Sequence, residues 1–378
     1  MPTGRQTDIA EARLRKDAGS GRPISPNMEP LWSLHYLRAV AALGVVLFHS
    51  LADTPWHFEL GAAGIHLFFT ISGFVIWTST CRSPPSPKRF AMARVRRIVP
   101  LYWVATLIAI LSTFVMPGYF WQATTRPVNV LTSLLFVPHE AVSGGVFPVL
   151  YQGWTLQYEM YFYALFCICL LLPVKLRTSA LCGWVVSAVA IGAILDPPGA
   201  VLQTYTNPVC LEFVAGVVAA QLLSRLGAGT SPARWLALAF LGAVTFLSAS
   251  AWESQLGWTA NLLIPLGAAA TIVGMAGLER SGAMFRSTWL RRAGEASYST
   301  YLFQTLGFAL VSAVLPHVPA VIRVILFVVS AQACGMAIAH YVEMPLLRLF
   351  RARPGQVGLE AQPVTATLPA QDNSIILR

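Results

Sequence analysis

Charged residues are scarce in this chain. Only 11% of its 378 residues are Asp, Glu, Lys or Arg, whereas a soluble domain has roughly 25%. Hydrophobic residues make up 56% of the chain, and the mean hydropathy is +0.61. This composition excludes an ordinary water-soluble domain. It predicts an all-α polytopic membrane protein, because about ten apolar stretches approach the roughly 20 residues with which a helix crosses a bilayer.

Several functional signatures are also missing. The six cysteines stand mostly inside apolar runs without CxxC spacing, which argues against a zinc site or a disulfide framework. There is no Gly-rich phosphate loop and no metal-ligand spacing, so we expect no metal and no tightly bound cofactor. The net charge of +10 does not indicate nucleic acid as a partner, because the basic residues cluster in short segments between the apolar stretches.

The apolar stretches define one membrane domain over residues 31–350. Residues 1–30 and 351–378 have too few large apolar side chains to form a core, and we expect both to be disordered tails. The ten stretches lie near residues 34–52, 61–80, 98–116, 154–172, 180–195, 208–224, 234–250, 258–277, 296–314 and 320–342.

The basic residues test this topology. With a cytoplasmic N-terminus and ten spans, 23 of the 26 Lys and Arg residues fall on the cytoplasmic side. Only Arg126 and Arg323 fall on the outer side, and Arg38 lies within the first span. Because cytoplasmic loops carry an excess of Lys and Arg, the pattern predicts that both termini are cytoplasmic.

The first span, LWSLHYLRAVAALGVVLFHS, carries Arg38 near one end and His49 near the other. At about 100° and 1.5 Å per residue, the two side chains lie within roughly 20° of one helix face and about 16 Å apart. A cation inside the membrane is costly unless it faces a polar interior, which favours a functional role. The alternative is that both side chains reach the membrane interfaces.

Four ionisable residues fall in the outer half of the membrane on this topology: His49, His66, Glu159 and Glu212. A neutral imidazole can accept a proton, and a carboxylate can orient it and stabilise its charged form. Such a pair could activate a hydroxyl group. His66 and Glu212 could equally be satisfied interfacial side chains.

Arginines gather at the inner half. Arg38 points toward Arg94, Arg96 and Arg97, which follow the second span. Guanidinium groups bind phosphate through paired hydrogen bonds, so this cluster suggests a phosphorylated ligand from the cytosol. The alternative is that these arginines set the membrane orientation and contact lipid headgroups.

Six ordered motifs closely resemble the acyltransferase-3 family of integral membrane acyltransferases, and most of all its branch that modifies bacterial exopolysaccharides. They are LRAVAALGVVLFHS, GAAGIHLFFTISGFVIW, RFAMARVRRIVPLYW, GWTLQYEMYFYALF, GEASYSTYLFQT and YVEMPLLR. The essential Arg and His of the family's first span match Arg38 and His49. Its RxxR motif matches Arg94 and Arg97, and its glutamate after a tryptophan motif matches Glu159.

This resemblance implies a multi-pass enzyme of the bacterial inner membrane. It would transfer an acyl group, usually acetyl, from cytoplasmic acetyl-CoA or another acyl-CoA to a sugar hydroxyl of a polysaccharide or its lipid-linked precursor. Arg38, Arg94 and Arg97 would bind the donor. His49 would act as the general base, oriented by Glu159, or would carry the acyl group transiently.

The chain departs from the family at two positions. Many members have an acidic residue in place of His66 and a His in place of Gln304, so we treat these two residues, with Glu212 and Tyr298, as candidates for acceptor binding or for support of the site. Tyr298 and Tyr301 also have the i, i+3 spacing of packing or interfacial aromatics. The functional alternatives are O-acylation of a small molecule such as a macrolide, and a polysaccharide transporter or flippase without enzymatic activity.

Overall fold

The structure is a computed structural model that describes residues 31–52, 54–81, 84–115, 126–142, 144–226 and 230–349. The two predicted tails, 1–30 and 351–378, lie outside the described residues. The longer helices are α2 (Trp32–Leu51), α3 (Gly64–Thr80), α4 (Pro87–Val115), α6 (Trp154–Cys169), α7 (Val174–Leu195), α9 (Cys210–Arg225), α10 (Pro232–Ala251), α12 (Ala260–Arg280), α14 (Ser297–Val314) and α15 (Ala320–Ile338).

Shorter elements connect them. They are η1 (Glu59–Ala63), α5 (Pro127–Leu134), η2 (Tyr151–Gly153), α8 (Ala200–Tyr205), α11 (Glu253–Leu256), η3 (Gly257–Thr259), α13 (Thr288–Glu295), the π-helix η4 (Ala339–Glu343) and α16 (Met344–Leu349). The described residues contain no β-strand, which confirms the all-α prediction.

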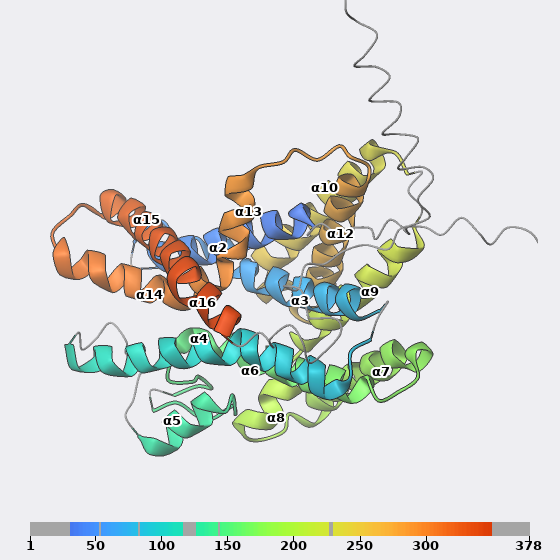
Figure 1. Ribbon diagram of the computed structural model, residues 1–378, viewed down its shortest axis with the longest axis horizontal. Coiled ribbons are helices and arrows are strands. Elements are labelled where there is room, and N and C mark those ends of the chain that lie inside the picture. Colours follow the sequence, from blue (N-terminus) through green and yellow to red (C-terminus); the bar gives the residue numbers. More distant parts are fainter. Residues whose placement is uncertain are drawn as a thin grey trace, which may run out of the picture.

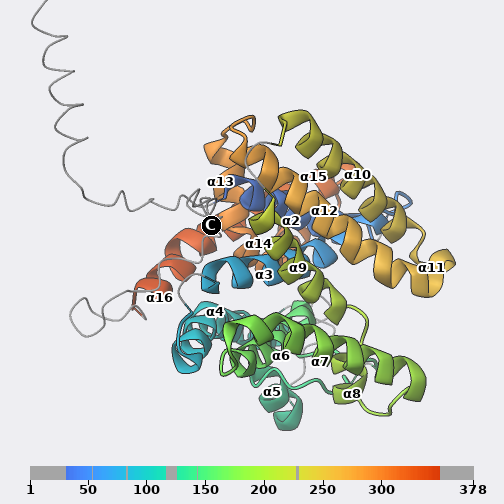
Figure 2. The ribbon, with the colours of Figure 1, turned by 90° about the vertical axis from the view of Figure 1, so that its right-hand side faces the viewer.

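Helices α2 and α3 occupy the centre of the bundle (Figures 1 and 2). Helix α2 packs against α3, α12, α13, α14 and α15, while α3 packs most extensively against α9. Two clusters of buried apolar side chains meet at α3, which contributes Phe69 to one and Ile71 and Phe74 to the other. Residues of α2 and α3 therefore face the interior, where a polar side chain must find a protein partner or a cavity.

Each of the ten predicted apolar stretches overlaps one of the ten longer helices. Eight candidate spans among the described residues are long and apolar enough to cross a membrane, which confirms the polytopic class. Helices α6 and α14 are not among the eight, because α6 has only 16 residues and α14 carries several polar side chains. Both are largely buried inside the bundle, where a helix can carry polar groups away from lipid.

Helices α3 and α9 are in unusually close contact. A Cβ atom at Gly73 would lie 2.0 Å from the Phe213 carbonyl oxygen, and one at Gly216 would lie 2.0 Å from that of Thr70. Only a residue without a side chain permits this backbone approach, as in membrane helices that pack through small residues. The contact fixes α9 against the face of α3 that carries His66 and Thr70.

The first turn of α2 is held by another helix. Helix α2 has no capping side chain of its own, and the Glu279 carboxylate accepts hydrogen bonds from the Trp32 and Ser33 amides, both at 2.9 Å. A carboxylate satisfies these free amides and complements the positive end of the helix dipole. Since Glu279 ends α12, this contact fixes the position of α2 and of the Arg38 that it carries.

Candidate active site

A cavity of about 90 Å³ lies inside the bundle, between α2, α3, α4, α6 and α14. Apolar side chains such as Ile65, Phe68 and Leu156 form part of its wall. Its polar lining consists of Arg38, Ser72, Arg94, Arg97, Thr155, Glu159, Tyr163, Ser297, Tyr298 and Tyr301. A concave, mostly apolar site with a few convergent polar groups is the expected form of a ligand site.

Three arginines from two helices line this cavity: Arg38 of α2, and Arg94 and Arg97 of α4. Arg94 is only 5% exposed, its guanidinium lies over the Tyr163 ring at 5.5 Å, and its Nε has no hydrogen-bond partner among the described residues. The lining contains one carboxylate, that of Glu159. The excess of positive charge in a water-poor interior favours an anionic ligand.

Arg38 is held from two sides. Its Nε donates a hydrogen bond of 3.1 Å to Ser297 Oγ, and its guanidinium lies over the Phe68 ring at 5.9 Å. Its two terminal nitrogens have no partner among the described residues, and the side chain is half-buried. The fork of the guanidinium is therefore left for a ligand.

Glu159 is fixed by two hydroxyl groups. Ser72 Oγ donates to Glu159 Oε1 at 3.0 Å, and Tyr163 Oη donates to the same oxygen from one turn further along α6. Sequence reasoning missed Ser72 and Tyr163. A serine hydroxyl within a membrane helix usually bonds its own backbone, and a tyrosine there usually serves as a packing or interfacial aromatic, so neither gives a distinctive signal.

His49 does not line the cavity. It lies near the opposite end of α2 from Arg38 and is half-buried between aromatic rings, with centroid distances of 5.0 Å to Phe48 and 6.3 Å to Tyr151. No hydrogen bond joins His49 to Glu159 in the described part of the chain, so the predicted orienting contact is not made in this conformation. Burial raises the pKa of the Tyr151 phenol, which keeps its hydroxyl protonated beside the imidazole.

A chain of hydrogen bonds connects the cavity with the surroundings of His49. Thr155 and Tyr301, both part of the lining, are joined at 3.2 Å, and Tyr301 Oη also donates to the Gln152 carbonyl at 3.1 Å. Gln152 lies in η2, just before α6, and follows Tyr151, whose ring contacts His49. The hydrogen bonds therefore reach from the cavity to η2, the element whose Tyr151 ring contacts His49.

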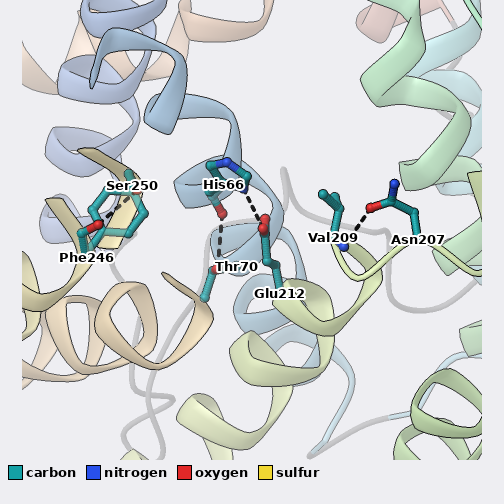
Figure 3. Close-up of polar contacts among 7 residues, drawn as sticks. All are labelled: His66, Thr70, Asn207, Val209, Glu212, Phe246 and Ser250. Carbon is teal, nitrogen blue, oxygen red and sulfur yellow. Dashed lines mark hydrogen bonds and ion pairs between the residues drawn. The ribbon is translucent and has the colours of Figure 1, made fainter. Parts of the chain in front are cut away.

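His66 and Glu212 form a separate pair (Figure 3). His66 Nδ1 and Glu212 Oε1 are 2.5 Å apart, at the first turns of α3 and α9. Glu212 is 3% exposed, and its other oxygen, Oε2, has no partner among the described residues. The two residues lie in the α3–α9 contact and not in the cavity lining, so the four predicted outer residues form no single cluster.

The remaining candidates are Tyr298, which is half-buried, and Gln304. Tyr298 lines the cavity and donates to the Ile98 carbonyl at 3.0 Å. Gln304 is fully buried outside the lining, and its Nε2 donates to the Tyr301 carbonyl at 3.2 Å. One further carboxylate, that of Glu343 in η4, was not predicted. It accepts a 2.5 Å hydrogen bond from Ser299, and its charge interacts with those of Arg97 and Arg38.

These features define a polytopic membrane protein with a basic internal cavity. The chain belongs to the family whose description is "Acyltransferase domain", and the match covers residues 31–340. It is therefore a membrane acyltransferase. Over 321 residues it is 36% identical to the "Exopolysaccharide production protein ExoZ" of Rhizobium meliloti (strain 1021), an alignment that covers 83% of this chain and 98% of that protein. No solved structure matches the chain.

Proposed function

We propose that this acyltransferase moves an acyl group, in the first instance acetyl, from acyl-CoA to a sugar hydroxyl of a bacterial exopolysaccharide or of its lipid-linked precursor. The observation that supports this proposal is the cavity, whose lining contains Arg38, Arg94 and Arg97 and a single carboxylate, that of Glu159. Guanidinium groups suit the phosphates of coenzyme A. The similarity to a protein named for exopolysaccharide production supports a polysaccharide acceptor.

The proposed location is the bacterial inner membrane, with both termini in the cytoplasm. Arg94 and Arg97 belong to the basic segment 84–97, which includes the first turns of α4 and which the proposed topology places on the cytosolic side. Acyl-CoA would therefore enter from the cytosol. The sugar would approach from the opposite end of α2, where His49 lies. Membrane lipids surround the bundle, and no bound cofactor or metal takes part in this proposal.

The proposed reaction uses His49 as the general base. The imidazole takes the proton of the sugar hydroxyl, and the hydroxyl oxygen attacks the thioester carbonyl carbon. The carbon–sulfur bond then breaks, and the coenzyme A thiolate takes the proton from the imidazolium, which yields an ester and free coenzyme A. His49 is available for this role because its ring makes no hydrogen bond to any described residue. Glu159 stabilises the positive charge that develops, and a change of conformation must bring the imidazole to the cavity.

Two measurements test this function. The purified protein, given acetyl-CoA and the deacetylated native polysaccharide, should release free coenzyme A, and a His49→Ala variant should lose this release while it still binds coenzyme A. Deletion of the gene in the native host should remove O-acetyl signals from the proton NMR spectrum of its polysaccharide. Movement of the acceptor across liposomes without release of coenzyme A would instead indicate a transporter.

A further inference from the structure

The motif GEASYSTY has no role in the reaction described so far, although its residues Ser297, Tyr298 and Tyr301 line the cavity together with the arginines. Ser297, at the start of α14, is fully buried and lines the cavity. Its hydroxyl donates a hydrogen bond of 2.8 Å to the Gly294 carbonyl. Since a hydroxyl has one proton, the oxygen of Ser297 is left as an acceptor toward Arg38 Nε, at 3.1 Å.

The backbone holds this contact in register. A Cβ atom at Gly294 would lie 2.0 Å from the His35 carbonyl oxygen, so the end of α13 is in direct backbone contact with α2, three residues before Arg38. Helix α13 packs along α2, and its own first turn is capped by Ser287, which accepts from the Leu290 amide. The carbonyl that orients the Ser297 hydroxyl is thus fixed relative to Arg38.

We propose that Ser297 is a positioning residue that sets the plane of the Arg38 guanidinium, so that its two terminal nitrogens present a fork to one phosphate group of the acyl donor. This inference rests on the proposed function. Nε is held by Ser297 and one face of the guanidinium lies over Phe68, so the plane has little freedom left. The fork remains free, and a planar guanidinium binds a phosphate through two parallel hydrogen bonds only when it is correctly oriented.

Binding of coenzyme A to the purified full-length protein, measured by isothermal titration calorimetry, tests this role. Ser297→Ala should raise the Kd for coenzyme A by about tenfold or more, which is the usual effect of losing a hydrogen bond to a charged group. Ser297→Cys keeps the side-chain size with a weak acceptor and should show a smaller loss. The matched control is Thr271→Val, because this buried hydroxyl bonds only the Gly267 carbonyl of its own helix and lies outside the cavity lining.

Two further comparisons separate positioning from a general effect on structure. Acetyl-pantetheine carries the thioester without the nucleotide phosphates, so its turnover should be little changed by Ser297→Ala while the KM for acetyl-CoA rises. In a double-mutant cycle with Arg38→Lys, which removes the fork, the loss caused by Ser297→Ala should largely disappear, since contacting residues are not additive.

The outcomes are distinct. If wild-type protein does not bind coenzyme A, the proposed function and this inference both fail. If wild-type binds and Ser297→Ala binds equally well, the function stands and the positioning role is wrong. Equal losses with acetyl-CoA and acetyl-pantetheine, or additive losses with Arg38→Lys, would also overturn it. Thermal unfolding of each variant in detergent shows whether Ser297→Ala is folded, and Ser297→Cys carries the test if it is not.

Discussion

Arg94 and Arg96 stand two residues apart on α4 in different surroundings. Arg94 is 5% exposed and lines the cavity, whereas Arg96 is exposed on the other side of the helix. We expect Arg94→Ala to raise the KM for acetyl-CoA by about 10- to 150-fold, the equivalent of about 1.5–3 kcal/mol for a hydrogen bond to a charged group. Arg94→Lys keeps the charge and loses the fork, so its KM for acetyl-CoA should lie between those of the wild type and Arg94→Ala.

The matched control for this prediction is Arg96→Ala, which removes the same charge from the same helix. Its KM should stay within about twofold of wild type, because an exposed charge is screened by solvent. Steady-state kinetics of coenzyme A release measure both variants. Equal effects at the two positions would mean that the arginines act only through the overall positive charge of this end of the protein.

The His66–Glu212 pair gives a prediction on stability. Replacement of His66 by Leu leaves both oxygens of the buried Glu212 without a partner, since Oε2 already has none among the described residues. Loss of one member of a buried pair costs about 3 kcal/mol, and replacement of both by apolar residues is often nearly neutral. We therefore expect His66→Leu to lower the midpoint of thermal unfolding more than His66→Leu with Glu212→Leu. A loss of stability in the double variant as large as the sum of the losses in the two single variants would contradict this.

The charged members of the site were more predictable from sequence than the neutral ones. An arginine or glutamate in an apolar stretch must face a polar interior, so the interior positions of Arg38 and Glu159 could be expected. Glu159 was expected beside His49, however, and it lies in the cavity with the arginines. Ser72 and Ser297 could not be chosen among the many hydroxyls of the membrane helices, since each hydroxyl can bond its own backbone. Nor does the helix pattern say which helix faces which, so the contact of His66 with Glu212 was not predicted.

The close packing of α3 and α9 makes a prediction for these two helices. Gly73→Ala or Gly216→Ala places a methyl group 2.0 Å from a backbone oxygen of the opposite helix, so the helices must move apart. Overpacking of this kind costs about 1–3 kcal/mol. Gly183→Ala in α7 is the matched control, because no atom lies within 4 Å of the new methyl group. Unfolding in detergent should show a lower midpoint for the first two variants and not for the third.

The ends of the helices were less predictable than their existence. The apolar stretch near 98–116 predicts only the second half of α4, which begins at Pro87 and includes the basic residues Arg94 and Arg97. Hydropathy detects the part of a helix that is as long as the lipid core, and not its extension into the interface.

The number of membrane crossings is a property of the whole molecule. The ten-span topology counts α6 and α14, although both fall short as isolated membrane helices. They carry Glu159, Tyr163, Ser297, Tyr298 and Tyr301 into the cavity, and this explains their polar character. A criterion of length and hydropathy therefore misses two of the five helices that line the cavity, while the distribution of basic residues still includes them.

Reporter fusions distinguish ten crossings from eight. With a cytoplasmic N-terminus, ten spans place the segment 281–287 between α12 and α13 in the cytoplasm, whereas eight spans without α6 and α14 place it outside. The two topologies agree on the C-terminus, which serves as the internal control.

Eight spans would also move the basic residues of segments 174–177, 225–234 and 280–292 to the outer side, against the usual orientation. We therefore expect alkaline phosphatase fused within 281–287 to be inactive and green fluorescent protein there to fluoresce, with the reverse for fusions within 315–319. An active phosphatase at 281–287 would show that α6 does not cross the membrane, since α14 follows this segment and cannot change its side. Glu159, which α6 carries, would then need another explanation for its place beside the arginines of α2 and α4.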